Sequence, residues 1–227
     1  FYDAFLKFIE DHRKKEKEYF LEQGRIVDRV HKEFSEQFLV ARNMVQEKLN
    51  IVDENNNIIG EETREDIHKK GLLHREVHVW IYNDNMDILF QRRAPDKDTF
   101  PDLLDASVGG HIDLGESREE AAIKELKEET GIIAKKEDLI FLRKTRTKHY
   151  DPVTDTTNNV IRAIYAYKFN GNVNELKIED GKATSLEFWP LDKLFHLTDE
   201  EKTKFIPFNW EKELLPIFKQ MQNLNKK

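Results

Sequence analysis

The chain has 227 residues, of which 38% are hydrophobic and 36% charged, and its net charge is −7. This length suits one domain with appendages, and the acidic charge argues against a nonspecific nucleic-acid binder, which needs a basic field. No apolar run approaches the length of a membrane span, and the lack of cysteine leaves no disulfide framework. We therefore expect a cytoplasmic protein without nucleic-acid or membrane partners.

Residues 1–49 predict a helical N-terminal arm. From Ile26 to Leu49 the apolar side chains recur at steps of three and four residues, which is typical of an amphipathic helix. Such an arm either packs on its own domain or binds a partner, for example by joining two copies into a homodimer. The periodicity is the same in both cases, and both interpretations stay open.

Residues 50–195 predict a mixed domain with several strand pairs. The expected pairs are 51–52 with 58–60, 77–82 with 88–92, and 139–147 with 160–169, followed by a last short strand at 185–189. The polar segment 149–159 between the third pair is expected to be a long loop. Loops of that kind often hold binding residues.

Residues 196–227 predict a C-terminal helical cap. The segment Glu211–Leu224 is amphipathic, and Pro216 within it either kinks the helix or marks its first turn. We expect this helix to cover one face of the domain.

The segment from Gly110 to Ile132, GHIDLGESREEAAIKELKEETGI, predicts a loop followed by one helix. Ser117 and Glu120 form a capping-box pattern, and Gly131 suits the left-handed position after the last turn. Within this helix Glu125, Glu128 and Glu129 are spaced at i, i+3 and i+4. They therefore share one face.

Three carboxylates on one helical face repel one another unless a cation lies among them. Gly109 and Gly110 allow backbone carbonyls to approach that cation, and Glu116 lies on the loop before the helix. Oxygen ligands of this kind suit Mg²⁺ or Mn²⁺, which bind and polarise phosphate oxygens. The alternative is a solvated acidic face, which explains neither the glycines nor the capped ends.

The same segment resembles the Nudix box, G-x5-E-x7-R-E-U-x-E-E-x-G-U, in which U is a bulky aliphatic residue. The positions that match are Gly110, Glu116, Glu125, Leu126, Glu128, Glu129, Gly131 and Ile132. Lys124 stands at the arginine position, and lysine cannot make the planar bidentate contact that arginine makes.

The resemblance implies an α+β fold, an α/β/α sandwich with a mixed sheet, over residues 50–195. It also implies metal-dependent hydrolysis of the pyrophosphate bond of a nucleoside diphosphate linked to another group. The implied catalytic residues are Glu125, Glu128, Glu129 and Lys124. The implied metal site takes Glu125, Glu128 and Glu129 together with Glu116, Gly109 and Gly110.

The run from Gly71 to Ser117 is similar to the Nudix branch that contains type I isopentenyl diphosphate isomerases and related bacterial hydrolases. Those isomerases hold a metal with three histidines and two glutamates and use a cysteine. His74 and His111 match two histidine positions and His68 lies near the third, but Gly109 replaces the cysteine. Thr157 and Asn159 stand where the glutamates would be, so a hydrolase is favoured over an isomerase.

The same branch implies that basic residues between the strand at 88–92 and the metal segment contact the substrate's diphosphate. The substrate-binding candidates are Arg92, Arg93, Lys97 and His111. Guanidinium groups suit this contact, although surface ion pairs with nearby aspartates are an equal alternative.

Further alternatives stay open. A Nudix-like module that binds a nucleotide without cleaving it is one, and an isomerase-like enzyme is another. The general base is a box glutamate or one of Glu175, Glu179 and Glu187. A second metal site at His68, His74, His78 and His111 is the less favoured interpretation, since histidines on strands are more often structural.

Overall fold

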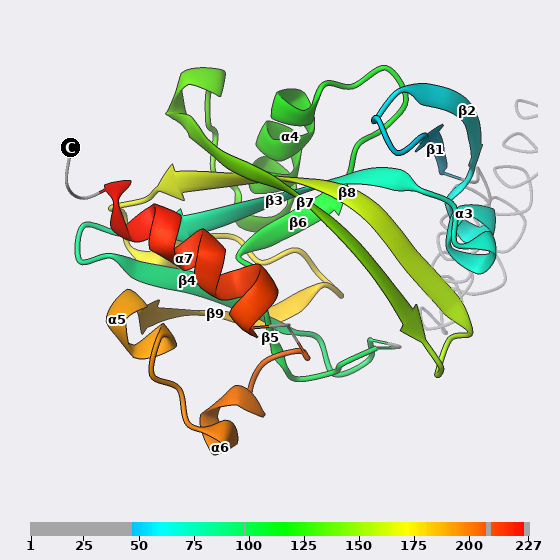
Figure 1. Ribbon diagram of the computed structural model, residues 1–227. Helices are drawn as coiled ribbons and strands as arrows, with labels where there is room; N and C mark the ends of the chain where they lie inside the picture. Colours follow the sequence, from blue (N-terminus) through cyan, green and yellow to red (C-terminus); the bar gives the residue numbers. More distant parts are fainter. Residues whose placement is uncertain (1–46, 98, 208–209, 225–227) are drawn as a thin grey trace, which may run out of the picture. The chain divides into compact units, whose positions relative to one another are not determined.

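The computed structural model describes residues 47–97, 99–207 and 210–224 (Figure 1). The expected N-terminal arm, and any homodimer through it, therefore lies outside the described residues except for residues 47–49. Lys48 and Leu49 do not end a helix but begin strand β1 (Lys48–Val52), which pairs with β2 (Ile58–Thr63). Leu49 is fully buried in β1, and this burial explains its apolar character as well as a helical position would.

A short helix, α3 (Arg64–Lys70), leads from this hairpin into a seven-stranded sheet. Its order is β5-β4-β3-β8-β7, while β6 pairs with β3 and β9 with β4. Strand β3 runs parallel to β8 and antiparallel to β4 and β6, so the sheet is mixed, as predicted. The strands are β3 (His74–Tyr82), β4 (Asp87–Arg93), β5 (Leu104–Asp105), β6 (Val108–His111), β7 (Leu139–Asp151), β8 (Thr156–Lys168) and β9 (Ala183–Pro190).

The two faces of the sheet are buried against different helices. On β3, Val77, Val79 and Ile81 pack toward α4 (Arg118–Thr130), while Trp80 and Tyr82 point to the opposite face. The opposite face is covered by α7 (Leu215–Gln222), shown in red in Figure 1. This is the α/β/α sandwich that the sequence predicts.

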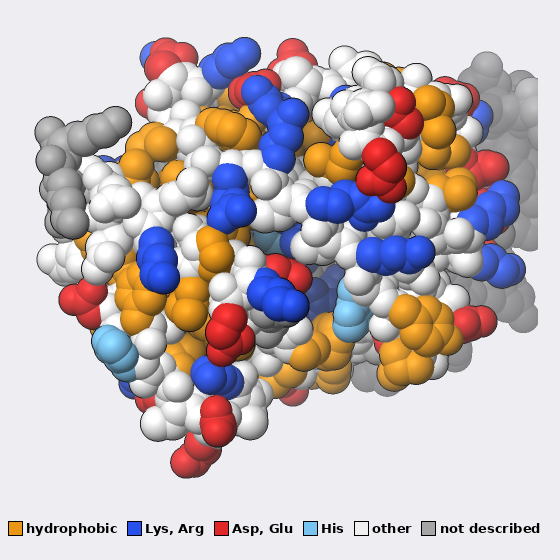
Figure 2. Space-filling view, in the orientation of Figure 1, with side chains coloured by type: hydrophobic (Ala, Val, Ile, Leu, Met, Phe, Trp, Pro, Cys, Tyr) orange, Lys and Arg blue, Asp and Glu red, His pale blue; other side chains and the backbone are white. Residues whose placement is uncertain are grey.

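Shorter elements complete the chain. They are η1 (Lys136–Asp138), η2 (Val173–Glu175), α5 (Leu191–Leu194), α6 (Asp199–Lys202) and a π-helical turn at Trp210–Leu214. Pro216 lies in the first turn of α7, where its missing N–H costs no hydrogen bond. Over the part of the chain described, no helix is long and apolar enough to cross a membrane. On the face drawn in Figure 2, acidic and basic side chains are interspersed.

The prediction of a long loop at residues 149–159 is wrong. Strands β7 and β8 continue until Asp151 pairs with Thr156, and only residues 152–155 form a turn, with Asp155 at φ 52°. Polar side chains on β8 find partners within the sheet. Asn158 donates to Glu76 and Asn159 to the carbonyl of Gly71. Because both side-chain amides donate to partners outside their own strand, a polar sequence continues as strand.

Candidate active site

The acidic helix begins and ends where the sequence predicts. The Ser117 hydroxyl accepts from the Glu120 N–H at 3.2 Å, and the Glu120 carboxylate accepts from the Ser117 N–H at 2.9 Å. Gly131 ends the helix at φ 73° and donates to the Lys127 carbonyl. These caps set where α4 begins and ends, and the packing of Ala122 and Leu126 against the sheet sets the direction of its glutamates.

The three glutamates of α4 differ in burial. The side chains of Glu125 and Glu129 are only 10% and 2% exposed, whereas Glu128 is exposed. One oxygen of Glu129 accepts the Gly109 N–H at 3.2 Å. The other oxygen is buried and has no hydrogen-bond partner among the described residues. A buried carboxylate oxygen of this kind fits a cation ligand.

Gly109 and Gly110, on β6, leave room that no other residue would leave. A Cβ on Gly110 would lie 2.2 Å from the Glu125 carboxyl carbon, and one on Gly109 would lie 2.7 Å from His78 Cδ2. Gly110 thus lets the backbone of β6 approach the Glu125 carboxylate, and Gly109 leaves room for the His78 ring. We call Glu125, Glu128, Glu129, Gly109 and Gly110 the carboxylate cradle.

Lys182, just before β9, reaches into the carboxylate cradle and was missed by the sequence reasoning. Its ammonium forms an ion pair with Glu129, lies 3.7 Å from Glu125 Oε2, and donates to the Gly109 carbonyl at 3.3 Å. No spacing pattern connects a residue after η2 with the box. Only the fold brings them together.

Lys124 lies beside the cradle on the helix. Its ammonium donates to Asp113, lies 3.4 Å from Glu116 Oε2 and 3.9 Å from Glu125 Oε1. Glu116 also accepts the Asp113 N–H at 3.1 Å. The arrangement places Lys124 and Glu116 where they orient Glu125, and it adds Asp113, which the sequence reasoning did not include.

Burial governs the protonation of the cradle. It raises the pKa of both Glu125 and Glu129, and the Lys182 ammonium only partly opposes this. Burial alone would lower the pKa of Lys124. Its hydrogen bond to Asp113 and the nearby carboxylates have the larger effect, so the pKa is raised above the ordinary value. A bound divalent cation would favour the ionised glutamates.

The cradle opens into a cleft of about 1070 Å³ that is bounded by β3, β6, β7, β8 and the segment after β4. Arg93, Lys97 and His111 line this cleft, as do Phe100 and His149, whose ring centroids are 6.5 Å apart. Arg93 is held by Asp105 at 2.9 Å and by the Thr99 carbonyl. It therefore orders the segment that carries Phe100.

Arg92 does not line the cleft. It alternates with Arg93 on β4, so its side chain points to the other face and bonds Glu187 at 2.7 Å and the Asp102 carbonyl. Glu187 is thereby engaged away from the cradle, and its second oxygen accepts from Trp189, which is buried in the core. Glu175 is exposed on η2, whereas Glu179 lies 3.8 Å from Lys182.

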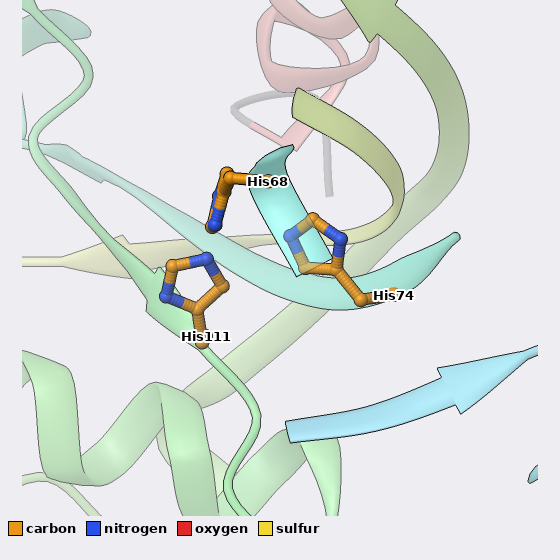
Figure 3. A group of neighbouring side chains, drawn as sticks. All are labelled: His68, His74 and His111. Atoms are coloured by element: carbon orange, nitrogen blue, oxygen red, sulfur yellow. The ribbon is translucent and has the colours of Figure 1, made fainter. Parts of the chain in front are cut away.

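Three histidines gather where α3, β3 and β6 meet. His68 from α3, His74 from β3 and His111 from β6 each offer a ring nitrogen, and these atoms lie within 4.8 Å of one another (Figure 3). His68 Nδ1 lies 2.8 Å from the Arg64 carbonyl and His74 Nδ1 lies 3.0 Å from the Leu72 carbonyl. These contacts orient both rings with Nε2 free toward the group.

Glu76 supplies the histidines with the carboxylate that seemed to be absent. Its Oε1 lies 4.0 Å from His74 Nε2 and 3.7 Å from His111 Nε2, neither of which has a hydrogen-bond partner among the described residues. Burial raises the pKa of Glu76, but the charge of the Arg162 guanidinium opposes burial, and the pKa lies below its ordinary value. We call His68, His74, His111 and Glu76 the histidine cluster.

The alternation of β3 contains a signal for Glu76. His74, Glu76 and His78 are two residues apart and therefore share one face of the strand. His78 does not join the cluster but contacts Gly109 on the cradle side. Thr157 and Asn159 supply no acidic side chain to the histidine cluster, and its carboxylate comes from the neighbouring strand.

Comparison with known proteins agrees with this geometry. The NUDIX domain model matches residues 72–209, which include both β3 and the whole acidic helix. This chain belongs to the Nudix family. Nudix hydrolases cleave pyrophosphate bonds, so the chain is a pyrophosphohydrolase by family.

Individual Nudix relatives support the assignment over different lengths. An uncharacterized Nudix hydrolase of Clostridium acetobutylicum is 31% identical over 161 residues, which are 70% of this chain and 77% of that protein. The isopentenyl-diphosphate Delta-isomerase 2 of Photorhabdus laumondii is 32% identical over 58% of this chain and 70% of its own. A Nudix hydrolase of Streptomyces coelicolor is 41% identical over 37% of this chain, and the match spans only 47% of that protein.

A solved structure supports the Nudix fold. The crystal structure of DR0079 from Deinococcus radiodurans superimposes with a TM-score of 0.50 and 24% sequence identity, covering 66% of this chain and 88% of its own. At this identity the similarity concerns the fold alone.

Proposed function

We propose that this Nudix protein hydrolyses the pyrophosphate bond of a nucleoside diphosphate linked to another group, with Mg²⁺ or Mn²⁺ as cofactor. The observation that carries the proposal is the carboxylate cradle. Glu125 and Glu129 are buried beside a backbone that only glycine permits, and one oxygen of Glu129 lacks a protein partner. Glu128 adds a third carboxylate from the exposed side of the helix.

The cradle divides the work between ligands and orienting groups. Glu125, Glu128, Glu129 and a carbonyl of Gly109 or Gly110 would hold the ion, and Lys124 and Glu116 would keep Glu125 in place. When bound, the divalent ion neutralises charge on the pyrophosphate and activates water for attack on phosphorus. The protein's own part is to position the diphosphate and to move a proton.

The far wall of the cleft suits the rest of the substrate. Lys97 and Arg93 bring positive charge toward a diphosphate, and Phe100 with His149 offers flat rings for a base. The lining identifies no particular base or sugar.

Glu179 is our candidate for the general base. Of the three glutamates that the sequence offers outside the box, it is the one that lies near the cradle, at 3.8 Å from Lys182. Its side chain is 45% exposed, so it can exchange protons with solvent.

The proposal is tested by phosphate release from a panel of nucleoside diphosphate derivatives with Mg²⁺ or Mn²⁺. We expect Glu129→Gln to lower kcat by about 10³-fold, since metal catalysis contributes several kcal/mol to the transition state. Glu137→Gln, at an exposed position on η1, is the matched control. Turnover that survives chelator and Glu129→Gln would contradict the proposal.

We further propose that the histidine cluster holds a second cation, for which imidazole ligands favour a transition metal such as Zn²⁺. Glu76 and the unpartnered nitrogens of His74 and His111 are the observations in its favour. His111→Gln should remove one bound Zn²⁺ per chain in equilibrium dialysis, and Glu129→Gln should not. Equal Zn²⁺ stoichiometry in parent and His111→Gln would contradict this site.

A further inference from the structure

Lys182 is held firmly at the mouth of the carboxylate cradle. Its carbonyl accepts the Ala94 N–H at 3.1 Å and its own N–H donates to the Glu179 carbonyl at 3.1 Å. These backbone contacts fix the chain just before β9. The side chain therefore reaches the cradle from a fixed base.

The Lys182 ammonium contacts the groups that the proposed function assigns to the metal. It pairs with Glu129, lies near Glu125, and donates to the Gly109 carbonyl. The side chain is 29% exposed, so most of it is removed from solvent. Two buried carboxylates without a cation would be strongly unfavourable, and Lys182 supplies that cation from within the chain.

We infer that Lys182 is a built-in competitor of the divalent ion, which neutralises Glu125 and Glu129 in the metal-free protein and is displaced from them when the ion binds. The inference rests on the proposed function, because it takes the same carboxylates as metal ligands. The Lys182 ammonium on one Glu129 oxygen and a divalent cation on the other, unpartnered oxygen would repel each other. Lys182 therefore weakens metal binding and stabilises the protein without metal.

Displacement has a consequence for the substrate. Lys182 lines the cleft beside Gly109 and Gly110. An ammonium released from Glu129 stays close to the cradle, because its backbone is anchored to Ala94 and Glu179. Metal binding thus frees a positive charge next to the place where the diphosphate binds.

The test compares Lys182→Met with the parent by isothermal titration with Mg²⁺ and by thermal unfolding in chelator and in Mg²⁺. Mg²⁺ is chosen because it prefers oxygen ligands and so avoids the histidine cluster. We expect Lys182→Met to bind Mg²⁺ at least about tenfold more tightly, since one competing charge is removed. Its Tm should be lower than that of the parent in chelator and should recover in Mg²⁺.

Two further variants control the comparison. Lys177→Met, at an exposed position on the same connection, should behave as the parent does. Lys182→Arg keeps the competing cation and should bind Mg²⁺ much as the parent does. If Lys182→Met is unfolded in chelator, Lys182→Gln provides the same neutral comparison with a polar side chain.

The outcomes separate the inference from the proposed function. Parent-like or weaker Mg²⁺ binding by the neutral variants, with binding by the parent intact and abolished by Glu129→Gln, would overturn the inference alone. A parent that binds no Mg²⁺, or binds it equally after Glu129→Gln, would overturn the proposed metal site and this inference with it.

Discussion

The carboxylate cradle and the histidine cluster both take residues from β6 but are built in different ways. The cradle takes its carboxylates from one helix, where a fixed spacing displays them in the sequence. The histidine cluster draws its members from α3, β3 and β6. A site on one element can therefore be predicted from sequence. A site assembled across a sheet can be predicted only when the strand pairing is known.

The two sites also differ in how their charge is balanced. In the cradle the net negative charge is met by two lysines, Lys124 and Lys182. In the histidine cluster one carboxylate, Glu76, is matched by Arg162 at 2.8 Å, and burial lowers the pKa of His74 and His111 and so favours their neutral forms. We therefore expect hard cations in the cradle and transition metals in the cluster.

Among these tests of the difference between the two sites, we expect the largest effect from Gly110→Ala. Its new Cβ would meet the Glu125 carboxyl group, which has to leave the cradle. We expect a loss of about 10²-fold in kcat/KM with Mg²⁺, measured by phosphate release, with Zn²⁺ binding at the histidine cluster preserved. Gly60→Ala is the matched control, because its Cβ would meet nothing closer than 4.0 Å. Equal activity of the two variants would show that Glu125 does not need this space.

Lys124 tests how precisely the cradle has to be oriented. Lys124→Ala removes the ammonium shared by Asp113, Glu116 and Glu125, and we expect activity to fall by roughly 10–100-fold. Lys124→Arg restores the forked donor of the family pattern and should retain or raise activity, since a guanidinium binds two carboxylate oxygens at once. Steady-state kinetics over a range of Mg²⁺ concentrations measures both. A Lys124→Ala variant with full activity would remove Lys124 from the site.

Glu76→Gln tests the same comparison at the histidine cluster. The amide keeps the shape of Glu76 but removes the charge that faces His74 and His111. We expect Zn²⁺ affinity to fall by at least about tenfold and Mg²⁺ affinity to stay unchanged. Titration of the variant with each metal gives both values. A fall in Mg²⁺ affinity alone would mean that Glu76 serves the cradle instead.

The smallest expected effect is a pH dependence of stability through His78. Burial, aided by the charge of Arg162, lowers the pKa of His78 to about 3. As pH falls below about 6.5, His78 is protonated in the unfolded chain before it is protonated in the folded one. Its contribution to stability is therefore full above that pH and decreases as pH approaches the pKa of His78 in the folded protein. One such histidine accounts for about 2 kcal/mol by pH 5.

The free energy of unfolding is measured in urea with chelator. We expect it to decrease less between pH 7 and pH 5 in His78→Gln than in the parent. Contributions of the cradle glutamates are common to parent and variant and cancel in the difference. His196→Gln, at an exposed position, is the control. Parallel curves for parent and His78→Gln would show that His78 does not titrate in this way.

Much of the fold and the helix of the candidate site could be predicted from local patterns. The capping box at Ser117, the turn at Gly131 and the apolar alternation of β3 each depend on near neighbours in sequence. The hairpin of β7 and β8 was predicted too short, because Asn158 and Asn159 gain partners from β3 and from the loop before β3. Local composition does not report such contacts.

The parts of the site that escaped prediction involve distant residues. Lys182 lies far from the box in sequence and reaches it only because β9 pairs with β4. The face of a strand residue also decides its role. Arg92 and Arg93 look equivalent in sequence, yet one bonds Glu187 and the other lines the cleft.

The most direct test of the central claim is hydrolysis in ¹⁸O-labelled water, followed by mass spectrometry of the phosphate products. For a nucleoside diphosphate derivative that the parent cleaves in Mg²⁺, we expect one ¹⁸O atom in one phosphate product, and none with Glu129→Gln. A nucleotide that binds without gaining ¹⁸O would identify a binding module. Rearrangement of isopentenyl diphosphate without cleavage would identify an isomerase, and either result would contradict the account.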